Sequence, residues 1–115
     1  RSTQRRRMNI TKYKETEKNL KVSILTNKTW TLEEELEEAQ RALEDAELDL
    51  AELEEDAFEI ESELAELDID PAREIYLSNE LEIIEHQIDE KQGEVEICKD
   101  DIETIEEEME LLDTL

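Results

Sequence analysis

The chain has 115 residues, of which 43% are charged, 37% are apolar and only 3% are aromatic, with a single glycine and a single proline. This composition excludes a multilayered core with an enclosed pocket and is typical of long helices rich in Glu, Leu and Ala. A net charge of −24 would also suit a disordered polyacid, but the regular apolar spacing described below argues against disorder.

Charge is divided unevenly along the chain. Residues 1–28 contain nine Lys or Arg against two Glu, a net charge of +7, whereas the remaining 87 residues carry a net charge of −31. We expect residues 1–28 to form a basic N-terminal helical extension. Three consecutive arginines there are candidate contacts to a polyanion such as nucleic acid or the tubulin surface, namely Arg5, Arg6 and Arg7. The alternative is an ordinary charged helix end within a longer protein.

The apolar pattern changes phase where the basic extension ends. A weak stripe formed by Ile10, Tyr13, Leu20 and Ile24 does not continue through the stretch 26–31. Thr31 and Glu34 have the spacing of a capping box, which marks helix starts. Either a new helix begins near Thr31 or one long helix passes through a weak stretch, and we favour the second.

From residue 29 onward we expect an acidic antiparallel coiled-coil hairpin. Two apolar stripes alternate steps of three and four residues, and a mean spacing of about 3.5 holds one face of a helix against a partner helix. The first stripe runs from Leu32 to Leu67 and the second from Leu77 to Leu112, with Lys91 as its only charged member. The predicted hairpin core consists of Leu36, Leu43, Leu50, Leu53, Ile60, Leu64, Leu77, Leu81, Ile84, Ile88, Val95, Cys98, Ile102, Ile105 and Met109.

A break between the stripes sets the architecture. Pro cannot continue a helix, whereas Asp at the N-cap followed by Pro at the first helical position is a favoured helix start. We therefore expect arms at residues 31–68 and 71–114, with a turn at 68–71 that contains Asp68, Asp70 and Pro71. Pairing residues whose numbers sum to 141 then aligns the stripes and sets small Ala residues against β-branched ones.

The sequence predicts no catalytic residue, cofactor or metal site. His86 falls on the solvent side of its helix, Cys98 occupies a core position, and carboxylates along a helix diverge, whereas a calcium site needs converging oxygens. No apolar run is long enough for a membrane span, and a single cysteine weakly favours an intracellular setting. Four outward-facing apolar residues are candidate partner contacts or self-association contacts: Trp30, Phe58, Tyr76 and Ile83.

Several segments of the chain resemble a known family. Ile88-Asp89, Val95, Cys98, Ile102 and Ile105-Glu106-Glu107, with Leu112-Asp113 more loosely, resemble the regulatory coiled coil in the stalk of kinesin-4 motors. The segment Arg6-Arg7-Met8-Asn9-Ile10-Thr11 is similar to the stretch preceding that coiled coil. Lys91 departs from this resemblance, because the family pattern is apolar there, and so does the turn, which is tighter and more acidic.

The resemblance implies an intramolecular antiparallel coiled coil that represses its own motor domain, within the chain or in trans, and limits motility and effects on growing microtubules. It also implies a cytoplasmic, cytoskeleton-associated protein that reaches microtubules only through the parent motor. A second hypothesis is a structural scaffold or dimerisation spacer of a cytoskeletal protein, associating in parallel through residues 1–28. A nucleic-acid binder using that segment is a third hypothesis, and the −31 charge of the remainder argues against it.

Overall fold

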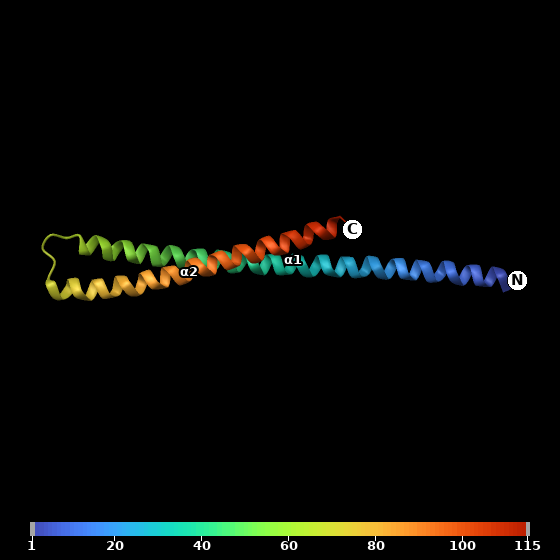
Figure 1. Ribbon diagram of the computed structural model, residues 1–115, viewed down its shortest axis with the longest axis horizontal. Helices are drawn as coiled ribbons and strands as arrows, with labels where there is room; N and C mark the ends of the chain where they lie inside the picture. Colours follow the sequence, from blue (N-terminus) through green and yellow to red (C-terminus); the bar gives the residue numbers. More distant parts are fainter. Residues whose placement is uncertain (1, 115) are drawn as a thin grey trace. The chain divides into compact units, whose positions relative to one another are not determined.

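The chain folds as an all-α helical hairpin, which confirms the predicted fold class. The computed structural model describes the backbone of residues 2–114 and the side chains of residues 13–114. Helix α1 spans Ser2–Leu64 and helix α2 spans Pro71–Asp113, and no strand occurs in this described part (Figure 1). Two compact units are present, which we call the terminal unit (residues 1–36 and 105–115) and the hairpin unit (residues 37–104).

In the hairpin unit, α2 begins where the sequence predicts a helix start. Pro71 is its first residue, and the backbone carbonyl of Asp70 accepts a hydrogen bond from the amide of Glu74 at 2.9 Å. Pro suits this position because its missing N–H has no partner in a first turn and its fixed φ is already helical. The chain then runs antiparallel to α1 within this unit (Figure 1).

The first arm ends earlier than predicted. Helix α1 stops at Leu64 rather than residue 68, so the connection occupies residues 65–70 instead of a turn at 68–71. The amide of Glu66 bonds to the carbonyl of Glu63 at 3.2 Å, a three-residue step that tightens the helix end. Leu67 is fully exposed, at 100%, and leaves the predicted stripe. Its expected partner, Glu74, is charged, so helical packing there would bury little apolar surface.

The two predicted stripes form the seam of the hairpin unit. Ala46, Ala57, Leu77 and Val95 are buried, and the other predicted core residues of this unit are half-buried. A coiled coil of only two helices shields each seam residue on one side, which explains why most of them keep some exposure. The 3.3 Å contact between Lys91 and Asp49 links positions whose numbers sum to 140, within one residue of the predicted register.

In the terminal unit, α1 passes through residues 26–31 without interruption. The hydroxyls of Thr26, Thr29 and Thr31 each donate to the carbonyl four residues earlier, at 2.9 to 3.0 Å. The hydroxyl of Thr31 therefore does not cap a new helix, and the expectation of one long helix is confirmed. Leu32 is buried in this unit and Leu25 is half-buried, whereas Tyr13, Leu20 and Ile24 are exposed.

Candidate functional site

One charged side chain lies in the apolar seam of the hairpin unit. Lys91 extends from α2 with its side chain 25% exposed, and its ammonium group lies 2.8 Å from Glu94 Oε2 and 3.3 Å from Asp49 Oδ2 on α1. Two hydrogen bonds raise the pKa of Lys91 above its ordinary value, and the bond to Glu94 contributes more than the bond to Asp49. This cluster links the two helices across the seam.

A second cluster braces the connection. Arg73, near the start of α2, donates from Nε to Glu63 Oε1 at 3.0 Å and from Nη2 to Glu63 Oε2 at 3.3 Å. Its guanidinium lies 5.4 Å from the ring centroid of Tyr76, within cation–π range. The bonded Glu63 carboxylate raises the pKa of Arg73. This bidentate pair joins the last turn of α1 to the first turn of α2 and so fixes the ends of the connection.

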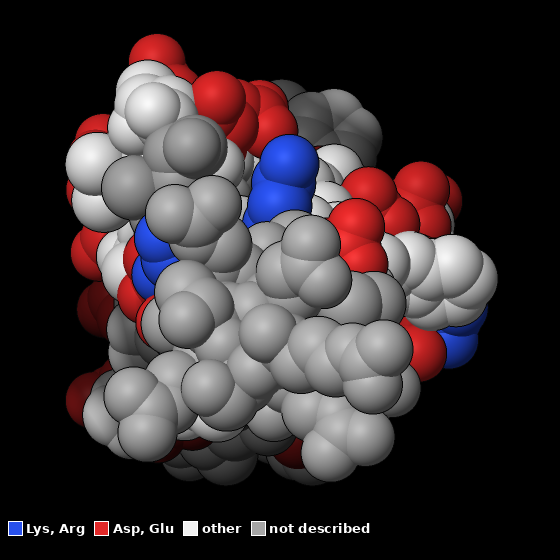
Figure 2. Space-filling view, turned by 90° about the vertical axis from the view of Figure 1, so that its right-hand side faces the viewer, with Lys and Arg blue, Asp and Glu red and all other residues white. Residues whose placement is uncertain are grey.

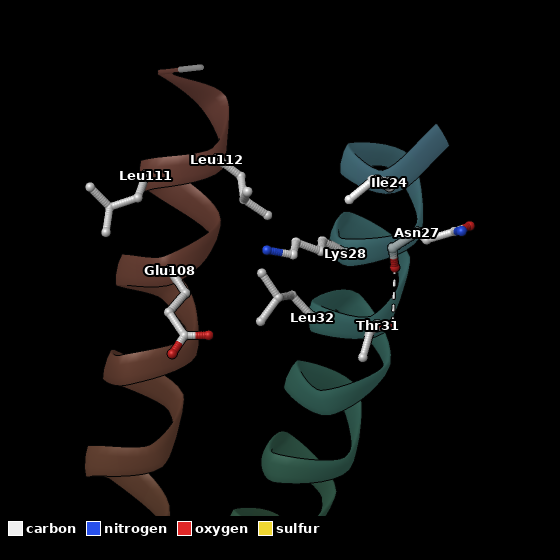
Figure 3. A pocket seen from close by; sticks show the side chains of 8 residues that line it. All are labelled: Ile24, Asn27, Lys28, Thr31, Leu32, Glu108, Leu111 and Leu112. Atoms are coloured by element: carbon white, nitrogen blue, oxygen red, sulfur yellow. Dashed lines mark hydrogen bonds between the residues drawn. The ribbon is translucent and has the colours of Figure 1, made fainter. Parts of the chain in front are cut away.

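The terminal unit contains an apolar groove of about 550 Å³ between α1 and the last turns of α2. In Figure 3, Leu32 and Lys28 from α1 and Leu112 from α2 point into the space between the helices, and Ile24 faces α2 as well. Leu111 points outward. The groove is lined by Ile24, Asn27, Lys28, Thr31, Leu32, Glu108, Leu111 and Leu112.

The predicted contact residues whose side chains are described belong to both units, with Trp30 in the terminal unit and Phe58, Tyr76 and Ile83 in the hairpin unit. Tyr76 lies against Arg73, whereas Trp30, Phe58 and Ile83 are exposed at separate positions on the two helices. The side chains of Arg5, Arg6 and Arg7 lie outside the described ones. In the view of Figure 2, Asp and Glu make up much of the visible described surface, with few Lys or Arg among them.

The sequence singled out Lys91 but did not identify the residue that it contacts on the other helix. Lys91 stood out as the one charge in its stripe, but Asp49 was not identified as its partner. Residue numbers that sum to about 141 were a usable signal, because they place Asp49 level with Lys91. The groove was missed entirely, since Ile24 belongs to the weak upstream stripe and is out of phase with the hairpin stripe that begins at Leu32.

Among the residues whose side chains are described, no group of three His, Cys, Asp or Glu is placed to hold a metal ion. His86 is largely exposed and lies 3.1 Å from Glu90 on the same helix, and the thiol of Cys98 is free and half-buried. Neither helix, over its described length, is apolar enough to cross a lipid bilayer.

The described part of the chain has three distinct structural features: the charged cluster at Lys91, the brace at Arg73 and the terminal groove. Comparison of the chain with protein-family models, with curated proteins and with solved structures gives no match.

Proposed function

We propose that this chain is a non-catalytic regulatory coiled coil of a kinesin-like motor, whose hairpin docks on the motor domain and holds it inactive. The observation that supports the proposal best is the seam of the hairpin unit, where α1 and α2 bury their apolar stripes against each other within one chain. A hairpin closed in this way needs no second chain to fold, so its outer faces stay available to a partner. The resemblance to kinesin-4 stalks supplies the identity of that partner.

The proposed mechanism is a shift between two populations of the motor. Docking that favours the inactive form by about 5.5 kcal/mol would move the equilibrium from 1:99 to 99:1, and a few kcal/mol would already produce strong repression. The acidic hairpin, with four basic and 27 acidic side chains in residues 37–104, suits a basic surface on the motor domain. Its action would be cytoplasmic, and its effect on microtubules would be indirect.

The test adds the purified chain in trans to a kinesin-4 motor domain and measures the landing rate on microtubules. The chain is expected to lower the landing rate, and a Leu43→Asn, Ile102→Asn variant, which opens the seam, is expected to lose this effect. The matched control is Leu48→Asn with Ile97→Asn, since both residues are exposed and their replacement leaves the seam intact. Circular dichroism reports whether each variant keeps its helices. A landing rate that the native chain leaves unchanged would rule out the proposal.

A second candidate is a structural scaffold or dimerisation spacer of a cytoskeletal protein. The exposed apolar side chains on α1 upstream of the groove favour it, because Tyr13 and Leu20 are each more than half exposed. This candidate predicts self-association of the chain and no effect on a motor domain. The landing-rate assay therefore separates the two candidates.

A further inference from the structure

The described N-terminal part of α1 has an apolar face without a partner helix in the terminal unit. Tyr13, Leu20 and Ile24 are 75%, 61% and 49% exposed. Tyr13 and Ile24 are eleven residues apart, about three helical turns, and Leu20 is one turn from Ile24, so all three share one face of α1. Val22 lies on the opposite face of the same segment.

This face leads directly into the groove of the terminal unit. Ile24 belongs to both, since it lines the groove together with Leu32 and Leu112. The groove marks the place where α2 ends at Asp113 and ceases to cover α1 (Figure 3). An additional helix packed on the exposed face would therefore meet the groove at Ile24, beside the seam formed between α1 and α2.

The distribution of charge indicates which helix packs on the exposed face of α1 and whether it lies parallel or antiparallel. The last turns of α2 in the terminal unit carry five acidic and no basic side chains, namely Glu106, Glu107, Glu108, Glu110 and Asp113, whereas residues 1–28 carry +7. A second copy lying antiparallel brings the basic segment of each chain toward the acidic end of the other. A parallel copy would place acidic end beside acidic end, where like charges repel.

We propose that two copies of this chain associate antiparallel through residues 13–24 of α1, with Tyr13 of each copy seated at the groove of the other. In this register Tyr13 of one copy lies level with Ile24 of its partner. The groove offers apolar contacts from Ile24 and Leu112 and polar groups from Lys28 and Glu108. A tyrosine suits such a lining, because its ring takes the apolar contacts while its hydroxyl reaches a polar partner.

The proposal does not rest on regulation of a motor, and its test contains no motor domain. Sedimentation equilibrium of the full chain, at concentrations up to about 1 mM, the weak end of specific association, is expected to show a monomer–dimer equilibrium. Ile24→Glu and Tyr13→Ala are each expected to raise the dissociation constant about tenfold or more. Val22→Glu is the matched control, because it introduces the same charge on the opposite face, and it is expected to leave the constant within about twofold.

Disulfide trapping tests the direction of the pairing. In a Cys98→Ser background, a chain carrying Tyr13→Cys is mixed with a chain carrying Ile24→Cys and oxidised. The antiparallel register predicts a bond between positions 13 and 24 of different chains, and no bond between two copies of the Tyr13→Cys chain. A monomer at every concentration, a 13–13 bond, or equal weakening by Val22→Glu and Ile24→Glu would each overturn the proposal.

Discussion

Leu77→Ala tests whether burial in the seam stabilises the hairpin. Leu77 lies near the start of α2, is 3% exposed, and has Leu64 as its predicted partner across the seam. Truncating a buried leucine removes its transfer free energy and leaves a cavity, which together cost about 2–5 kcal/mol. A seam only two helices deep can partly collapse around the gap, so we expect about 2–3 kcal/mol here.

Such a loss is large for a small helical domain. It corresponds to a decrease of about 8–24 °C in melting temperature, since 1 kcal/mol shifts a domain of this size by about 4–8 °C. Thermal and urea unfolding followed by circular dichroism measure both quantities at fixed salt. The control is Leu48→Ala, because Leu48 is 63% exposed and its truncation should change stability by no more than about 0.5 kcal/mol. Equal destabilisation by the two variants would refute the assignment of the seam.

Three further predictions concern the helix backbone and the charges. Gly93→Ala is expected to stabilise α2 by about 0.8–1 kcal/mol, because the position is helical and an added Cβ meets no atom within 4 Å. Urea unfolding measures the gain in the free energy of unfolding, and a decrease in that free energy would contradict the prediction. Added salt is expected to raise the melting temperature, because it screens repulsion within the acidic hairpin unit, and a melting temperature that falls with salt would count against this. The raised pKa of Lys91 means that the folded state favours its charged form, so its contribution is present below the ordinary lysine pKa of about 10.4 and disappears as the pH rises through the raised value. Unfolding of the native chain and of Lys91→Gln across alkaline pH should therefore converge, and a constant difference between them would disprove the linkage.

The amino-acid sequence by itself determined the helices and the faces that they bury. Spacing is a local property, so the alternation that includes Leu43 and Leu50 was enough to identify one face of a helix, and its counterpart that includes Ile84 and Val95 identified the other. Pro71 marked the start of α2 for a reason that is also local, namely its fixed φ and missing N–H. The antiparallel alignment followed from matching the two stripes across a short connection.

Only the tertiary structure decided where the chain leaves the seam and which charges meet. Leu67 continues the apolar spacing, yet it is fully exposed because the chain needs residues 65–70 to reverse direction. Three features depend on side chains that come together from different helices. They are the ion pair of Lys91 with Asp49, the ion pair of Arg73 with Glu63 and the groove beside Ile24. Periodicity assigns each residue to a face of its own helix, but distances across the seam are set by the packing of two helices against each other.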